Sequence, residues 1–172
     1  MKRNIFVVVV GLVLVLLLAG CTPKPVINVN LGDDIIPLNG DFNNQGCTIT
    51  ISSEDHLMTR TANPVNNEVV GQYILVYEYT HNETVYTCER MVFVVDDIAP
   101  IVTLNAGIDT ITVGTEWIDS SVTSIDNYDT ELTLDISGEV DYNSIGRYMI
   151  TYTVTDMSEN VAEIVRYVTV IE

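Results

Sequence analysis

The side chains of this 172-residue chain that could do chemistry are mostly acidic, because 24 Asp and Glu face only 7 Lys and Arg. Nucleophilic catalysis needs a nucleophile, a base and an orienting group. The two histidines, His56 and His81, lie in expected loops without a catalytic motif around them. A carboxylate pair of the glycosidase type is possible by number alone. The sequence also lacks a Gly-rich phosphate loop and a zinc-protease motif, so we predict that the protein is not an enzyme.

One acidic constellation could bind a cation. Calcium takes about six to eight oxygen ligands, mostly carboxylates and carbonyls. Three separate segments supply the candidate ligands, which are Asp97, Asp126, Asp129, Asp156 and Asn160. Asp and Asn are also common in turns, where their side chains bond to nearby backbone, and this explains each residue singly. The two interpretations differ in whether the fold brings the segments together.

The first 20 residues have the layout of an export signal. Lys2 and Arg3 precede an apolar run over residues 5–18, and small residues follow it. A charged start, an apolar middle and a small-residue end are typical of a cleaved signal peptide. The run is shorter than the roughly 20 residues that a helix needs to span a bilayer. An uncleaved short anchor is the alternative.

The end of this segment, Leu18-Ala19-Gly20-Cys21, resembles the lipobox of bacterial lipoproteins. The resemblance implies that residues 1–20 are removed and that the thiol of Cys21 carries a lipid with acyl chains such as palmitate. Residues 21–25 would then be a lipidated tether, and several acyl chains would make the attachment durable. The mature protein would face outside the cytoplasm at the cell membrane or elsewhere in the envelope. Plain secretion is the alternative.

If Cys21 is lipidated, Cys47 and Cys88 are left as a pair in an oxidising compartment. This favours a disulfide, with two buried free thiols as the alternative. A metal site at the pair is not expected, because neither histidine has a ligand-like spacing from the cysteines. Their separation does not have the Cys-x-x-Cys form of a redox-active pair.

The net charge of the whole chain is −17, and removal of Lys2 and Arg3 with the signal takes it to about −19. Phosphate binding needs clustered Lys and Arg, so nucleic acid is excluded as a partner. The acidity is typical of a soluble surface that resists association. Attraction of cations or basic partners is the alternative.

Short runs rich in Val, Ile, Thr and Tyr, such as residues 73–79 and 148–155, alternate with turn-forming residues. This pattern predicts antiparallel β-sandwiches. The chain also repeats itself: residues 70–73 match 145–148 at a separation of 75, and residues 90–94 match 166–170 at a separation of 76. One residue has therefore been lost from the last hairpin of the first copy. We predict two units, 26–96 and 101–172, joined by a linker over 97–100.

The second unit resembles a bacterial Ig-like repeat that is found in surface lipoproteins, in multidomain extracellular proteins and beside some pesticidal crystal toxins. The resemblance rests on residues 100–104, 114–119, 126–129, 138–141, 145–156 and 160–170. It implies a seven-stranded β-sandwich but no single function. Gly71-Gln72-Tyr73 and Gly146-Arg147-Tyr148 resemble the tyrosine corner of such domains. The first unit lacks a counterpart of Trp117 but contains both Cys47 and Cys88, which the repeat places at core positions of one sandwich.

An Ig-like topology places the acidic candidates at one end of the second unit. The chain enters a sandwich at the end where the second-to-third and sixth-to-seventh strand loops emerge. Those loops hold residues 126–129 and 156–160, and the linker arrives beside them. We therefore expect Asp97, Asp126, Asp129, Asp156 and Asn160 to gather near the junction, where calcium would stiffen the pair of modules. No cofactor is otherwise required.

The sequence thus predicts a lipid-anchored surface protein whose Ig-like modules serve binding, adhesion or spacing. The membrane is the expected partner through Cys21, together with a protein or glycan that the sequence does not name. An accessory subunit of an envelope transport or secretion complex is one alternative. A carbohydrate-binding module is the other.

Overall fold

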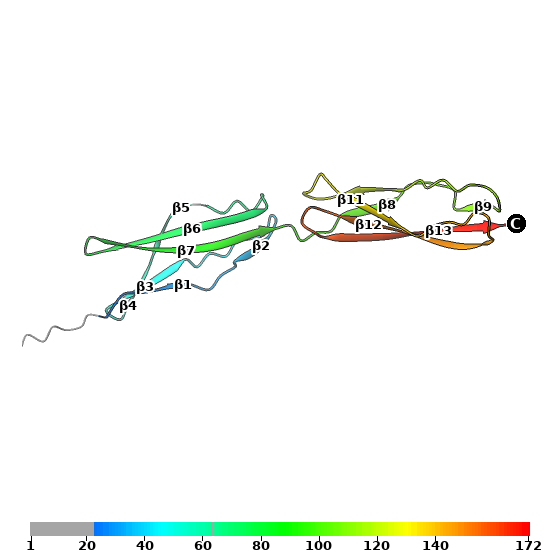
Figure 1. The fold of residues 1–172 in the computed structure, drawn as a ribbon. Coiled ribbons are helices and arrows are strands. Elements are labelled where there is room, and N and C mark those ends of the chain that lie inside the picture. The colour runs from blue at the N-terminus through cyan, green and yellow to red at the C-terminus, as the bar shows by residue number, and fades with distance from the viewer. Residues whose placement is uncertain (1–22, 63) are drawn as a thin grey trace, which may run out of the picture.

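The computed structural model describes residues 23–62 and 64–172, and the regular structure of this part of the chain consists of strands alone. Cys21 and the expected signal peptide lie outside the described residues. Two β-sandwiches lie end to end along the chain (Figure 1), and the predicted all-β class of Ig-like sandwiches is confirmed. Within the described residues no helix is long and apolar enough to cross a membrane.

The first sandwich has a three-stranded and a four-stranded sheet. The three-stranded sheet has the order β1 (Val26–Val29), β3 (Cys47–Ile51) and β4 (Glu54–Leu57). The four-stranded sheet has the order β2 (Ile35–Pro37), β7 (Thr84–Val95), β6 (Gly71–His81) and β5 (Thr59–Ala62). Side chains alternate between the two faces of a strand, so every second residue of β3 and β7 enters the space between the sheets. Ile49, Leu75 and Val92 are fully buried there.

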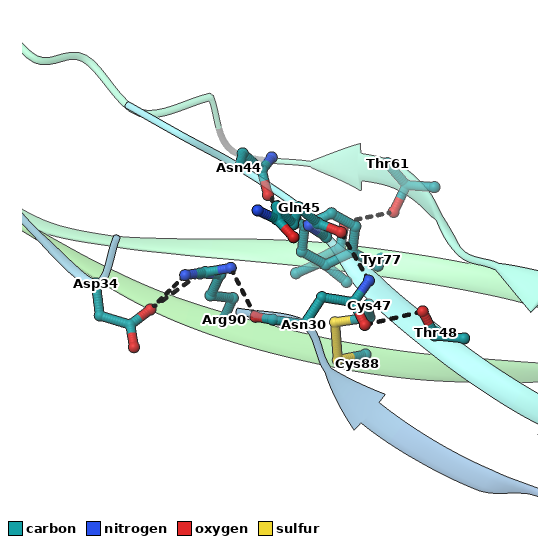
Figure 2. The surroundings of a disulfide bond; sticks show 12 residues. Asn30, Asp34, Asn44, Gln45, Cys47, Thr48, Thr61, Tyr77, Cys88 and Arg90 are labelled. Atoms are coloured by element: carbon teal, nitrogen blue, oxygen red, sulfur yellow. Dashed lines mark hydrogen bonds and ion pairs between the residues drawn. A yellow bond between two sulfur atoms is a disulfide. The ribbon is translucent and has the colours of Figure 1, made fainter. Parts of the chain in front are cut away.

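A disulfide between Cys47 of β3 and Cys88 of β7 joins the two sheets of this sandwich. The predicted pairing is confirmed, and Figure 2 shows its surroundings. Both cysteines are buried, with exposed fractions of 0% and 6%. The bridge is therefore a covalent part of the core.

The second sandwich is described in full and has six strands. One sheet pairs β8 (Ile101–Leu104) with β10 (Val122–Ile125), and the other has the order β11 (Thr133–Ser137), β12 (Gly146–Thr155), β13 (Val161–Ile171) and β9 (Thr110–Thr112). The family resemblance implied seven strands, and the described residues of the first sandwich form that number. In the second sandwich, the segment equivalent to β4 follows a turn closed by the side chain of Asp126, and it does not pair with β10.

The pairing differs from the antiparallel prediction at one edge of each sandwich. The short strands β2 and β9 pair in parallel with β7 and β13, respectively. All other strand pairs are antiparallel. Pro37 ends β2, which is an edge strand where a missing backbone N–H is tolerated.

The internal repeat is visible in equivalent polar contacts. In the first sandwich, the buried guanidinium of Arg90 pairs with Asp34, at 2.9 Å from Nη2 to Oδ1. In the second, Nη1 of Arg166 pairs with Asp109 Oδ1 at 2.7 Å. Each arginine also donates to backbone carbonyls of the loop that faces it. Both copies of the repeat therefore use an arginine side chain of the last strand to hold a loop by hydrogen bonds.

Tyrosines follow the same repeat. The hydroxyl of Tyr73 donates to the carbonyl of Val69 and that of Tyr148 to the carbonyl of Ser144, both at 2.8 Å. These bonds confirm the two tyrosine corners. In the second sandwich the fully buried Tyr152 donates to Asp119 Oδ1. Burial is the main cause that raises the pKa of Tyr152 to about 12, and the hydrogen bond to Asp119 and the negative charge of Asp119 add to it.

Candidate metal centre

Two hairpins that the repeat makes equivalent end differently. In the first sandwich, β6 and β7 pair as far as His81 and Thr84, leaving a two-residue turn. In the second, β12 and β13 stop pairing at Thr155 and Val161 and leave the loop 156–160. Counted between equivalent strand pairs, the first hairpin is one residue shorter, which confirms the predicted loss. The extra residue gives the second sandwich a loop that begins with Asp156.

The loop 156–160 is fixed by its own side chains. The carboxylate of Asp156 accepts from the backbone N of Asn160 at 2.8 Å and from its side-chain Nδ2 at 2.9 Å. The same Nδ2 donates to the backbone carbonyl of Asp96 in the linker, at 3.2 Å. Asn160, a predicted metal ligand, thus holds the carboxylate of Asp156 and the linker through its amide nitrogen.

A second acidic loop follows β10. Asp126 Oδ1 accepts from the backbone N–H groups of Tyr128 and Asp129, each at 2.9 Å. Partial burial acts to raise the pKa of Asp126, but the bonds from these two groups and from Asn127 outweigh it and leave the pKa below its usual value. Asp129 Oδ2 accepts from the backbone N of Met157, at 3.0 Å, which connects the two loops.

The linker contributes Asp96, the neighbour of the Asp97 that the sequence predicted. Residues 88, 90, 92 and 94 of β7 all face the interior, and the alternation continues past the end of the strand. Asp96 is consequently only 5% exposed, whereas Asp97 points to solvent. Period-2 alternation carried beyond the strand would have identified Asp96 from the sequence.

The fold brings four carboxylates together: those of Asp96, Asp126, Asp129 and Asp156. One oxygen from each lies within 4.8 Å of the oxygens from the other three. Ligands on opposite sides of a calcium ion are about 4.6–5.2 Å apart, given calcium–oxygen distances of about 2.3–2.6 Å. Magnesium, at about 2.0–2.1 Å, would require a smaller cage. The oxygen-only set and its spacing therefore suit calcium.

The charges of this cluster are uncompensated within the described residues. The ion pairs of that part of the chain are those of Arg90 and Arg166, and neither involves the cluster. Two unit charges 4.8 Å apart repel by about 3 kcal/mol at an effective dielectric constant of about 20. Turn chemistry, the alternative interpretation, accounts for the two hydrogen bonds that Asp126 and Asp156 each accept. It does not account for four carboxylates converging without a cation.

Two buried oxygens of the cluster have no hydrogen-bond partner among the described residues. They are Asp96 Oδ2 and Asp126 Oδ2, and both atoms are buried. Asp96 Oδ1 is satisfied by the backbone N of Ile98 and by Asn127 Nδ2, at 3.3 and 3.2 Å. A buried carboxylate oxygen without a partner is costly, since nothing replaces the water it has lost.

Trp117 marks a different feature of the second sandwich. Its indole is half-buried, and Nε1 donates to the carbonyl of Ile108 at 2.9 Å. The ring lines two shallow hollows. One of them also has Tyr142 and the acidic residues Glu116 and Glu139 on its walls. Aromatic rings beside carboxylates are groups that could contact a sugar.

A comparison with protein families finds a match for the second sandwich. Residues 104–170 match the family described as bacterial surface protein, Ig-like domain. A comparison with curated proteins found no match. The second sandwich is therefore similar, in fold and in sequence, to a bacterial surface Ig-like domain. The match contains Asp126, Asp129 and Asp156 but begins after Asp96, so the carboxylate cluster combines the module with the linker that precedes it.

Proposed function

We propose that this protein is a lipid-anchored, non-catalytic surface protein whose two sandwiches form an acidic rod. The observation that carries the proposal is the end-to-end arrangement of two Ig-like sandwiches, the second of which matches a bacterial surface family (Figure 1). The first described residues and the C-terminus lie at opposite ends of the molecule. Such a rod holds its far end away from the surface to which its N-terminus is tethered.

The net charge supports a spacing role. The whole chain has a net charge of −17, and a surface of one sign resists association with acidic neighbours. Ig-like surface modules are typically not enzymes, and the buried polar groups of these sandwiches have structural roles. Arg90 and Arg166, for example, hold loops against the last strand of each sandwich.

The lipid anchor is tested at Cys21. Cells that express the full chain are fed an alkyne analogue of palmitate, and the protein is examined for label and for partition into detergent. We expect label and membrane association in the wild type and loss of both in Cys21→Ala. The double variant Cys47→Ala/Cys88→Ala is the matched control and should keep its label. Label that persists in Cys21→Ala, or that is absent from the wild type, would contradict the anchor.

Carbohydrate recognition is a second candidate role, favoured by the hollow that Trp117 and Tyr142 line with acidic residues. A glycan array probed with residues 22–172 tests it. Binding to a defined sugar that is lost in Trp117→Ala, with Tyr128→Ala as an aromatic control outside the hollow, would favour this role over spacing alone. The accessory-subunit role predicts instead that a cross-linked envelope partner is recovered in cells.

A further inference from the structure

We propose that Asp96, Asp126, Asp129 and Asp156 bind one calcium ion that fixes the linker to the second sandwich. Four carboxylate oxygens lie mutually within 4.8 Å. A single ion with calcium–oxygen distances of about 2.4 Å can therefore contact all of them, and backbone carbonyls or water would complete its coordination. The inference goes beyond the proposed function, because it concerns the ectodomain and does not depend on the anchor.

An independent observation points to a ligand within the cluster. Asp96 is 95% buried, and its Oδ2 atom is shielded from solvent without a hydrogen-bond partner in the described part of the chain. Asp126 Oδ2 is buried in the same way. Turns require one oxygen of an Asp side chain, and in both residues Oδ1 already has that role. The second oxygens are left for a cation, which would offset their lost hydration.

The position of Asp96 gives the ion its structural effect. Asp96 directly follows β7, the last strand of the first sandwich, whereas the other three carboxylates belong to loops of the second. A bridging ion would therefore connect the linker, where the first sandwich ends, to two loops of the second sandwich. Three hydrogen bonds of the described residues cross this junction. Val70 N donates to Tyr128 Oη at 3.3 Å. Asn127 Nδ2 donates to Asp96 Oδ1, and Asn160 Nδ2 donates to the Asp96 carbonyl, both at 3.2 Å.

The first sandwich has no equivalent cluster among its described residues, which explains why one ion is expected. The positions equivalent to Asp126, Asp129 and Asp156 are Ile51, Glu54 and His81 by the repeat separation of 75. Only one of these three residues is acidic. The tight turn after β6 also leaves no loop comparable to residues 156–160.

Calorimetric titration of calcium into residues 22–172, stripped of metal with a chelator, tests the proposal. We expect one site, with an affinity in the range of about 0.1–1 mM that is common in extracellular modules. The loss of an outer-sphere partner alone costs about 10- to 100-fold in metal affinity, so Asp96→Asn should weaken binding by at least about tenfold. Asp97→Asn is the matched control, because it removes the same charge from an exposed neighbour, and its affinity should equal that of the wild type.

Three outcomes would overturn the proposal. These are the absence of binding to the wild type at millimolar calcium, unchanged affinity in Asp96→Asn, and an equal loss in Asp97→Asn, which would indicate general charge screening. In chelator, Asp96→Asn should melt at or above the wild-type temperature, because one repelling charge is gone. If it fails to fold, Asp129→Asn takes its place in the titration.

Small-angle scattering of the same protein tests the effect on the linker. Calcium should narrow the distribution of molecular dimensions in the wild type and in Asp97→Asn but leave it unchanged in Asp96→Asn. Binding without narrowing would overturn the bridging role of the ion. Narrowing that persists in Asp96→Asn would show that the effect arises elsewhere.

Discussion

Reduction of the Cys47–Cys88 disulfide should destabilise the first sandwich and leave the second intact. The bridge closes a segment of the chain with a sequence separation of 41 residues. In the chain-entropy model a loop of that length restricts the unfolded chain by about 4 kcal/mol. The reduced thiols remain in a core that already accommodates both sulfur atoms, so the native sandwich itself changes little.

The magnitude is large for a module of this size. The strands of the first sandwich span Val26 to Val95, or about 70 residues. Domains are stable by about 0.05–0.15 kcal/mol per residue, which gives roughly 3.5–10 kcal/mol for the sandwich. A loss of about 4 kcal/mol would therefore leave the sandwich with at most about 6 kcal/mol and would unfold it at the lower end of that range.

The two sandwiches can be followed separately in one sample. Trp117, the single tryptophan of the chain, belongs to the second sandwich, so its fluorescence in urea reports the unfolding of that module alone. Hydrogen exchange followed by mass spectrometry reports the β6–β7 hairpin of the first. We expect reduction to accelerate exchange in β6 and β7 while the midpoint of the tryptophan transition stays unchanged.

Two results would refute this reasoning. If exchange in β6 and β7 is unaffected by reduction, the bridge does not limit the unfolded chain as the loop length requires. If the tryptophan transition falls together with the first sandwich, the modules unfold as one cooperative unit. The double variant Cys47→Ala/Cys88→Ala gives a larger loss than reduction, because it also removes buried sulfur atoms.

Other predictions concern the second sandwich, and Trp117 fluorescence reports each of them. The pKa of Tyr152 is raised from 10 to about 12. The protonated phenol therefore contributes roughly 2–3 kcal/mol to the free energy of unfolding below pH 10, and this contribution is lost as the pH rises through 12. Tyr152→Phe should flatten this alkaline loss of stability, and an unchanged loss would show that another group causes it. Gly138 has a φ of 98°, and a Cβ there would fall on the carbonyl oxygen of Met149, so Gly138→Ala should cost roughly 3 kcal/mol or more in the free energy of unfolding. Gly114, with a φ of 84° and open space around it, is the matched control: Gly114→Ala should cost only about 1 kcal/mol, and equal losses would contradict the steric argument.

Local sequence patterns were sufficient for much of the fold. The alternation of apolar and polar residues in 148–155 specifies a strand with one buried face, and the structure has β12 there with Ile150, Tyr152 and Val154 buried. The internal repeat likewise predicted two sandwiches and the shorter hairpin of the first copy. The repeat could not predict the number of strands in the second sandwich. The residues after β10 are compatible both with the Asp126 turn and with a hairpin like that of β3 and β4.

The candidate site was predicted in outline, but the structure has Asp96 rather than Asp97 among its carboxylates. Turn-forming acids mark the two loops of the second sandwich, and an Ig-like topology places those loops at the end where the linker arrives. The choice between Asp96 and Asp97 depends on which face of β7 continues into the linker. That face follows from the alternation along β7, because residues 88, 90, 92 and 94 are buried and Asp96 continues the series.

The sequence by itself determined the repeat, the strands, the pair of cysteines and the acidic loops, because these follow from local periodicity and residue type. Only the tertiary structure decided which side chains meet. The tertiary structure buries Arg90 and Arg166 beneath the loops that they contact. It also brings together four carboxylates from positions as far apart in the sequence as Asp96 and Asp156, a separation of 60. Such distances depend on how two sheets and a linker pack, and packing is a property of the whole sandwich.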